Sequence, residues 1–259
     1  MQQGRPQVVA RVGALLRALG ECEPAGGSTT RLAALAGLAR PTTHRLLTSL
    51  VEQGMVDRAA DNGRWSLGPE LYLLGSAAAA RYDITGQARD IVHTLARETG
   101  ESAFVSARRG DESVCVLRED GSFPLRSHVL HEGIRLPLGV ASAGLAILSH
   151  LGDRQVDSYF ARADLVPRWG AAHAEARVRE RIAATRLTGW AVNPALLVEG
   201  SWGLGAAVFD GDGRPAWALS LTGVETRFRP ERHDELGALL LDQAHRLTQR
   251  LSLAQTGAR

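Results

Sequence analysis

Apolar residues recur at helical spacing along the first part of the chain. A first helix is expected over residues 6–19, where valines and leucines fall on one face. A loop rich in Gly, Pro and Ser follows, and then a second helix is expected over 31–37, ending at Gly37. A third helix is expected over 41–53. Two helices joined by a short turn that contains glycine are typical of a helix-turn-helix motif.

The ends of these helices also carry sequence signals. Thr29 or Thr30 can cap the second helix, because a threonine hydroxyl accepts a hydrogen bond from a free backbone N–H. Pro41 lies in the first turn of the third helix, a position that tolerates a missing N–H. Both signals support the predicted starts.

The stretch MVDRAADNGRWSLG alternates apolar and polar residues on both sides of Asp61-Asn62-Gly63, a strong signal for a two-stranded hairpin. Three helices and a hairpin predict a winged helix-turn-helix domain over residues 1–68. An apolar helix over 69–82 follows it, and its length and position suit a linker that also packs against a partner.

Residues 83–259 mix strand and helix patterns and predict one α+β domain with an antiparallel sheet, since its strands are mostly joined as hairpins. Hairpins are expected in SAFVSARRGDESVCVLRE and in LGAAVFDGDGRPAWALSLTG, and a further strand in FPLRSHVL. Helices are expected over 86–99, from a cap at Ser142, over 153–188 with Pro167 between two segments, and from Pro230 through Leu253.

The third helix has one apolar and one polar face. Its buried side is expected to hold Thr43, Leu46, Leu47 and Leu50, and its outer side Thr42, His44, Arg45 and Ser49. Arg, Ser and Thr side chains read base edges in the major groove, and the N-terminal residues of the second motif helix do this reading. A merely solvated amphipathic helix is the alternative, which the preceding helix, the glycine turn and the hairpin disfavour.

Composition and charge narrow the classes of protein. The 259 residues have a net charge of +2, with no lysine, and residues 1–68 hold eight arginines against five acidic residues. This local excess permits nucleic-acid binding without proving it. Arg58 and Arg64 on the hairpin can reach phosphates or can be ordinary surface arginines, and Trp65 is expected to pack the hairpin onto the helices.

Other features favour a cytoplasmic protein without cofactors. No apolar run approaches the roughly 18 to 20 residues that a membrane span needs, and the N-terminus lacks the apolar region of a signal peptide. We therefore expect no membrane association. Cys22 and Cys115 match no metal-ligand or redox spacing, so no metal and no cofactor are expected.

The chain resembles the IclR family of bacterial transcriptional regulators over about residues 8–253. TTRLAALAGLARPTTHRLLTSLVEQGMV and RWSLGPELYLLG are similar to that family's DNA-binding half. ETGESAFVSARRGDESVCVL, GIRLPLGVASAGLAIL, GWAVN and GLGAAVFDGDGRPAWALSLTG follow its effector domain in order. Family members often carry a serine where Pro41 stands, so this helix lacks a side-chain cap, and its free N–H groups could meet a DNA phosphate.

The resemblance implies a regulator whose binding to a double-stranded DNA operator is controlled by a small-molecule effector, such as an organic acid or an aromatic compound. It also implies a homodimer or a dimer of dimers, with a GAF/profilin-like effector domain built on a six-stranded sheet. We expect DNA contacts from Thr30, Arg40, Thr42, Thr43, His44, Arg45, Arg58 and Arg64. The resemblance places effector contacts at Ser142, Ala143, Asn193, Ser201, Gly203, Ser220 and Thr222.

The chemistry of these residues supports part of the effector site. Ser142 and Ala143 begin a helix whose free N–H groups suit a carboxylate or another polar head group, although Ser142 can equally be a plain cap. No buried arginine is evident in this set, which favours a neutral or weakly anionic ligand. Ser220 and Thr222 are two apart in a strand and share one face, which faces either a pocket or solvent. Glycines opposite them would leave room for a ligand. Asn193, which precedes a proline, is also a common turn former.

Two other classes of protein are the alternatives. An enzyme is disfavoured, because the serine of GVASAG comes one place late for a nucleophile elbow and a lone strand cysteine is usually a core residue. The second is a ligand sensor whose winged helix binds protein rather than DNA. A mobility shift with the upstream DNA separates these classes.

Overall fold

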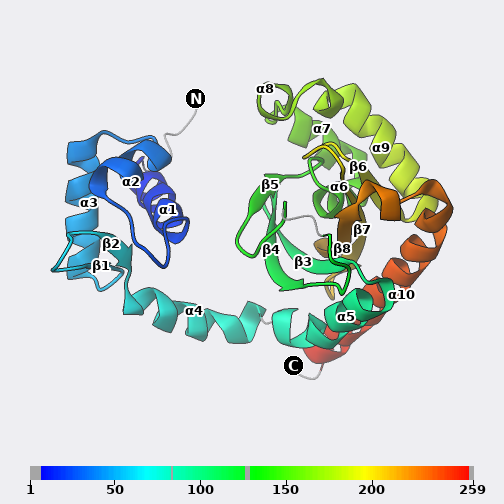
Figure 1. The fold of residues 1–259 in the computed structure, drawn as a ribbon, viewed down its shortest axis with the longest axis horizontal. Coiled ribbons are helices and arrows are strands. Elements are labelled where there is room, and N and C mark those ends of the chain that lie inside the picture. The colour runs from blue at the N-terminus through cyan, green and yellow to red at the C-terminus, as the bar shows by residue number, and fades with distance from the viewer. Residues whose placement is uncertain (1–6, 83, 126–128, 257–259) are drawn as a thin grey trace. The chain divides into compact units, whose positions relative to one another are not determined.

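The structure is a computed structural model that describes residues 7–82, 84–125 and 129–256. Internal contacts divide the chain into two units, Met1–Asp83 and Ile84–Arg259, each with its own core (Figure 1). No helix in the described ranges is long and apolar enough to cross a membrane.

The first unit is a winged helix-turn-helix, as predicted. Its elements are α1 (Gln7–Gly20), α2 (Thr29–Ala36), α3 (Arg40–Glu52), β1 (Val56–Arg58), β2 (Trp65–Leu67) and α4 (Pro69–Tyr82). β1 and β2 pair antiparallel to form the wing. Leucines from the first three helices pack with Val56 and Trp65 into one small core.

The start of α2 differs from the prediction. Ser28, rather than Thr29 or Thr30, is the N-cap, and its hydroxyl accepts a hydrogen bond from Arg31 N. The two threonines are instead the first helical residues, so their hydroxyls are left for other contacts. At the other end Gly37 adopts φ 64° and ψ 35°, the left-handed conformation that ends a helix without steric cost in glycine, as expected.

The second unit is an α+β domain. Its strands are β3 (Ser102–Arg109), β4 (Glu112–Glu119), β5 (Arg135–Pro137), β6 (Trp190–Pro194), β7 (Ser201–Phe209) and β8 (Pro215–Val224). Its helices are α5 (Ile84–Thr99), α6 (Ser142–Ser149), α7 (Asp153–Phe160), α8 (Val166–Trp169), α9 (Glu175–Thr188) and α10 (Pro230–Thr256), with 3-10 turns at Ala171–His173 and Glu225–Arg227.

The six strands form one sheet in the order β5-β4-β3-β8-β7-β6, and every neighbouring pair is antiparallel. α5 and α10 pack on one face of this sheet. Leu219 and Leu221 of β8 belong to the hydrophobic core between this face and the two helices. α6 packs on the other face, with α7 and α9 outside it, over Phe104 and Ala218 (Figure 1). The predicted antiparallel sheet is confirmed.

Two local predictions in this unit were wrong. The stretch FPLRSHVL forms no strand over its described residues, 123–125 and 129–130; the edge strand β5 comes later, where Leu136 buries its side chain against β4. Pro124, which lacks an N–H, suits a loop better than a ladder. Ala141, not Ser142, is the N-cap of α6. Pro167 lies between the helical segments α7 and α9, as predicted, in the first turn of the short helix α8.

The start of α6 lies directly on strand β7. A Cβ placed on Gly205 would lie 2.6 Å from both the carbonyl carbon and the carbonyl oxygen of Ser142, and 2.9 Å from Ala143 N. Only a residue without a side chain permits this approach of helix backbone to strand backbone. The glycine thus fixes where α6 begins over the sheet.

A buried carboxylate connects the end of α5 with the start of α10. Glu101, whose side chain is 1% exposed, is bonded by Arg227 and by Arg232 at 3.0 Å. Both arginines also donate to the carbonyl oxygen of Thr99. The cluster ties the end of α5 and the start of β3 to the start of α10.

Gly205→Ala is expected to lower the free energy of unfolding of the second unit by about 1–3 kcal/mol, because the new methyl group must displace the backbone of α6. Urea denaturation followed by tryptophan fluorescence measures the change. Gly75→Ala is the control, since a Cβ at this helical position meets nothing within 4 Å. Equal stability of Gly205→Ala and wild type would contradict the close contact.

Candidate functional site

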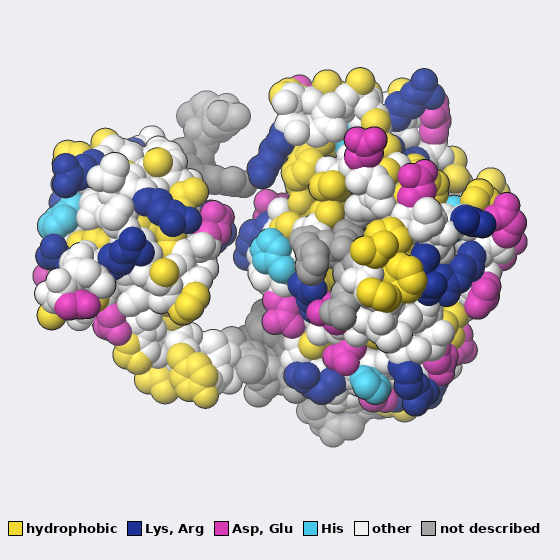
Figure 2. Space-filling view, in the orientation of Figure 1, with side chains coloured by type: hydrophobic (Ala, Val, Ile, Leu, Met, Phe, Trp, Pro, Cys, Tyr) yellow, Lys and Arg dark blue, Asp and Glu magenta, His cyan; other side chains and the backbone are white. Residues whose placement is uncertain are grey.

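Helix α3 separates packing residues from exposed polar residues. Leu47 and Leu50 are buried in the core, and Leu46 packs against it. His44, Arg45, Thr48 and Ser49 are exposed, Thr42 is half-buried, and Arg40 and Thr30 are exposed nearby in sequence. Figure 2 shows arginine and histidine side chains on the face that carries α3 and the wing. The exposed set matches the predicted outer face.

Thr43 departs from the predicted set of DNA contacts. Its side chain is 0% exposed, and its hydroxyl donates to the carbonyl oxygen of Ala39 at 3.2 Å. A threonine at this position of the first turn has its hydroxyl within reach of the carbonyl four residues earlier. Thr43 therefore packs the helix start and presents no surface to a nucleic acid.

Trp65 fixes the wing against α2 and α3. The residue is 2% exposed, and its indole Nε1 donates to Thr29 Oγ1 at 2.9 Å. The His44 ring meets the indole ring edge-on, with centroids 5.7 Å apart. The expectation that Trp65 packs the wing is confirmed, and the contact with His44 orients one of the exposed side chains of α3.

The two wing arginines already have contacts within the protein. The Arg64 Nη1 donates to the carbonyl oxygens of Ala25 and Gly26, each at 3.1 Å, which holds the loop before α2 against the wing. The Arg58 guanidinium lies 4.9 Å from the centre of the Trp65 ring, within the range of a cation–π contact. Both residues remain exposed, so either can still face a phosphate.

A row of polar residues crosses the second unit's sheet beneath the start of α6. Antiparallel register places Asn193 opposite Gly203, Gly203 opposite Thr222, and Thr222 opposite Ser102. Side chains of directly opposite residues share a face of the sheet. That face is the α6 face, because Phe104, two residues after Ser102, and Ala218, four residues before Thr222, share the face of the row and belong to the core beneath α6.

Ser220 and Thr222 share this face, as predicted, and the solvent-facing alternative is wrong. Their exposed fractions are 0% and 6%. Neither hydroxyl has a hydrogen-bond partner among the described residues, and the hydroxyl of Ser102 has none either. Buried hydroxyls are nearly always paired in folded proteins, so three unpaired ones on one sheet face call for a physical explanation.

A small cavity opens between α6 and this row. Five of the seven predicted effector residues line it: Ser142, Asn193, Ser201, Gly203 and Thr222. Ala143 and Ser220 do not line it, since they lie at the contact of α6 with Gly205. Val129, Leu130 and Leu197 supply apolar walls from two loops. The cavity has about 10 Å³, roughly the room that one water molecule needs, so the site is closed in this conformation.

Two predictions about individual residues of this site need correction. The space above Gly205 is filled by the backbone of α6, so this glycine admits a helix rather than a ligand, whereas Gly203 lines the cavity and faces the Ser142 hydroxyl at 3.1 Å from an added Cβ. Asn193 uses both ends of its amide within the protein: Nδ2 donates to Val140 O at 2.6 Å, and Oδ1 accepts from Leu196 N at 3.0 Å. It orders the loop that walls the cavity.

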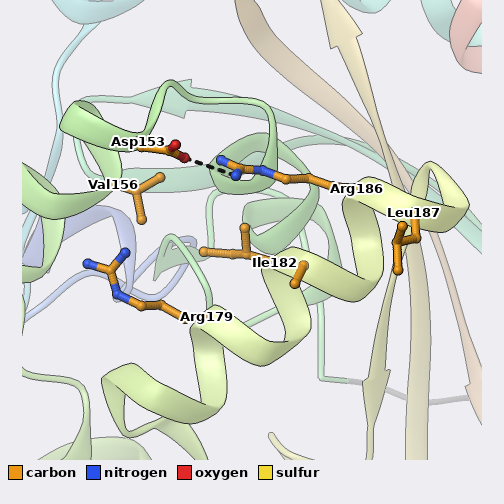
Figure 3. Close-up of a pocket in the computed structure, with 7 residues that line it drawn as sticks. Asp153, Val156, Arg179, Ile182, Arg186 and Leu187 are labelled. Atoms are coloured by element: carbon orange, nitrogen blue, oxygen red, sulfur yellow. Dashed lines mark hydrogen bonds and ion pairs between the residues drawn. The ribbon is translucent and has the colours of Figure 1, made fainter.

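A larger groove of about 400 Å³ lies between α7 and α9 (Figure 3). Val156, Ile182 and Leu187 line it, and Arg186 and Arg179 border it. Both arginines are paired, Arg186 with Asp153 at 2.9 Å and Arg179 with acidic neighbours. The groove holds none of the predicted site residues, and its cations are already neutralised.

Cys115 has the properties of a core residue. Burial raises the pKa of its thiol to about 12, so the group is protonated at neutral pH and is a poor nucleophile. In the described ranges, no group of three or more His, Cys, Asp or Glu side chains could hold a metal ion.

A winged helix-turn-helix with an exposed polar face on α3, followed by a separate sheet domain, is typical of DNA-binding transcriptional regulators. The chain belongs to the IclR family. Residues 8–60 match the family model described as the IclR helix-turn-helix domain, and residues 76–249 match the one described as bacterial transcriptional regulator IclR, C-terminal.

Individual relatives are similar over most of their length. The transcriptional repressor IclR of Escherichia coli strain K12 is 28% identical over 85% of this chain and 81% of its own. The glycerol operon regulatory protein of Streptomyces griseus is 30% identical over 87% of each chain. The crystal structure of an IclR homolog from Microbacterium hydrocarbonoxydans, complexed with 4-hydroxybenzoate, has a TM-score of 0.76 at 20% identity and covers 94% of this chain and 98% of its own.

Sequence reasoning missed two features of these sites. Ser102 was not singled out, because its position beside Thr222 is set by strand register. The bond from Trp65 to Thr29 joins residues far apart in the chain, and no local pattern signals it.

Thr29→Val is expected to lower the free energy of unfolding of the first unit by about 1–3 kcal/mol, because the substitution keeps the shape but leaves the buried indole N–H unpaired. Chemical denaturation followed by Trp65 fluorescence measures the loss. Thr30→Val is the matched control, an exposed threonine at the next position of the same helix. A similar loss in both variants would show that helix propensity, not the hydrogen bond, is responsible.

Proposed function

We propose that this regulator binds a two-fold symmetric operator as a homodimer, with α3 in the major groove, and that a small organic acid bound beneath α6 controls this binding. The observation that supports the DNA interface is the exposed polar face of α3, on which the side chains of His44 and Arg45 lie outside the core that holds the helix. The proposed base-reading set is Thr42, His44 and Arg45, with Arg40 and Thr30 beside it. Thr43 is left out because it is buried.

The start of α3 is also proposed to hold a phosphate. Ala39 is the N-cap and makes no side-chain hydrogen bond to the helix, and Pro41 follows within the first turn. Free N–H groups at a helix start and the positive end of the helix dipole together attract an anion. Arg58 and Arg64 on the wing would add phosphate contacts, which strengthen binding without reading sequence.

The surface of α4 supports a dimer. Tyr72, Leu73 and Leu74 are 77%, 58% and 49% exposed, and Figure 2 shows hydrophobic side chains gathered along this helix. Three neighbouring large apolar side chains on one exposed helix indicate a surface that another chain covers. A two-fold dimer places two reading helices an integral number of DNA turns apart, about 10 bp each.

DNase footprinting on the DNA upstream of the chain's own gene tests this proposal. Two protected half-sites with their centres an integral number of helical turns apart are expected. Protection of one isolated half-site would contradict the dimeric arrangement. No protection, together with capture of a specific protein, would favour the alternative in which the winged helix binds protein.

Arg45→Ala is expected to weaken operator binding by about 1–3 kcal/mol, because a guanidinium that contacts a base or a phosphate is lost. Fluorescence anisotropy with labelled operator at fixed salt measures it, and size-exclusion chromatography checks that the oligomer is intact. Arg17→Ala, an exposed arginine on α1, is the control. Wild-type affinity in Arg45→Ala would remove this residue from the interface.

The proposed effector is a small organic acid whose carboxylate lies between the start of α6 and Thr222. The N–H groups at a helix start suit an anion, and the unpaired hydroxyl of Thr222 can donate to the same group. The Microbacterium homolog, which binds 4-hydroxybenzoate, also takes a carboxylate ligand. Since the cavity is closed here, the acid binds in a conformation in which this cavity is wider. The acid controls operator affinity by favouring that open conformation.

Thr222→Val is expected to weaken binding of propionate, a minimal carboxylate probe, by about tenfold or more, since the isosteric side chain cannot donate a charge-assisted hydrogen bond. Isothermal titration calorimetry measures the affinity, and operator binding without acid should not change. Thr226→Val is the matched control, because Thr226 is exposed just beyond β8. Unchanged propionate affinity in Thr222→Val would place the effector site elsewhere.

A further inference from the structure

Strand β2 of the wing has a neighbour on each of its edges. β1 pairs with one edge. Along the other edge runs the loop between α1 and α2, where Gly27 and Trp65 exchange two backbone hydrogen bonds of 2.8 and 3.0 Å. A Cβ added to Gly26 would lie 2.8 Å from the carbonyl oxygen of Trp65, so the loop backbone approaches the strand closely. The wing is therefore held to the helices by this loop as well as by the core.

A side chain of the same loop extends this contact to the last residue of β2. N–H groups two residues apart in a strand point to the same edge, so the N–H of Leu67 follows that of Trp65 along the edge. Its acceptor is the carboxylate of Glu23, since Leu67 N donates to Glu23 Oε1 at 2.7 Å. Such a short distance is typical of a hydrogen bond to a charged acceptor. Glu23 thus supplies the acceptor that a neighbouring strand would provide at the end of β2.

The charge of Glu23 by itself disfavours DNA binding. The residue is exposed, and a carboxylate repels the phosphates of a bound operator, so its removal alone would strengthen binding. The bond to Leu67 acts in the opposite direction. Arg58 lies opposite Trp65 in the register of the wing, and its guanidinium is 4.9 Å from the centre of the indole ring. The position of Arg58 therefore depends on β2, and a loose end of β2 would displace this arginine.

We propose that Glu23 is a positioning residue for DNA binding, whose bond to Leu67 N holds the wing where Arg58 contacts a backbone phosphate. This inference rests on the wing contact of the proposed function. Loss of the bond removes one phosphate contact, which lowers both the affinity and its dependence on salt. A glutamine at this position preserves the bond, because its amide oxygen is also an acceptor.

Fluorescence anisotropy of the full chain with labelled operator, at several salt concentrations, tests the inference. Glu23→Ala is expected to bind about fivefold or more weakly than wild type, and the slope of log affinity against log salt concentration should become shallower by about one. Glu23→Gln should bind at least as tightly as wild type. Glu21→Ala is the matched control, an exposed acidic residue two positions earlier, and it too should bind at least as tightly as wild type.

Combining Glu23→Ala with Arg58→Ala separates the positioning role from a general weakening of the fold. The double variant should bind as Arg58→Ala alone does, because the phosphate contact is already lost. A merely structural role would add its own loss in the Arg58→Ala background. Melting curves without DNA should place Glu23→Ala close to wild type, since Glu23 is exposed and lies outside the core of the first unit.

Four results would overturn the inference: wild-type or tighter binding by Glu23→Ala, an equal loss in Glu23→Gln, additive losses in the double variant, or a much lower melting temperature of Glu23→Ala. If Arg58→Ala weakens binding but Glu23→Ala does not, the wing contact stands and only the role of Glu23 falls. If Arg58→Ala binds operator with wild-type affinity and salt dependence, the wing contact of the proposed function is wrong, and the inference falls with it.

Discussion

The contact of α6 with strand β7 is the constraint on which the second unit depends. Because Gly205 has no side chain, the helix backbone lies against the strand backbone, and the helix start is held over a polar row of the sheet. A longer side chain there would lift α6 and separate its free N–H groups from Thr222. The cavity, its polar floor and its small size all follow from this one approach, and so does the burial of Ser220.

The polar side chains of the two candidate sites differ in their exposure to solvent. On α3 they are exposed, and water satisfies them until DNA replaces it, so they cost the free protein little. Beneath α6 they are buried and unpaired, so they cost the free protein stability, and in the proposed effector site a bound polar ligand would remove that cost. Exposed polar groups suit a protein that tests many DNA sequences one after another. Buried, unpaired groups suit a selective response to one ligand, since an apolar molecule of the same size leaves the cost in place.

The sequence predicted most of the architecture because its strongest signals are local. The Asp61-Asn62-Gly63 turn, the glycine stop at Gly37 and the strand alternation of β3, β4 and β8 each act over a few residues. The errors came from choices that tertiary contacts make. Ser28 caps α2 while Thr29 accepts the hydrogen bond from Trp65, and Gly205 of β7 lies against a helix instead of a ligand. Ser102 lies beside Thr222 because of the strand register, which no spacing within one segment reveals.

The division of labour along α3 has an evolutionary consequence. The residues that hold the helix in place, Thr43, Leu47 and Leu50, are completely separate from the exposed His44, Arg45, Thr48 and Ser49. Exposed positions of a helix exchange at little cost to folding. If α3 reads the operator as proposed, descendants of this chain can therefore acquire new target sequences by substitution at the exposed positions alone, while the residues that hold the helix in place stay unchanged. His44 is the exception, because its ring also contacts Trp65, and its replacement would remove a contact between α3 and the wing.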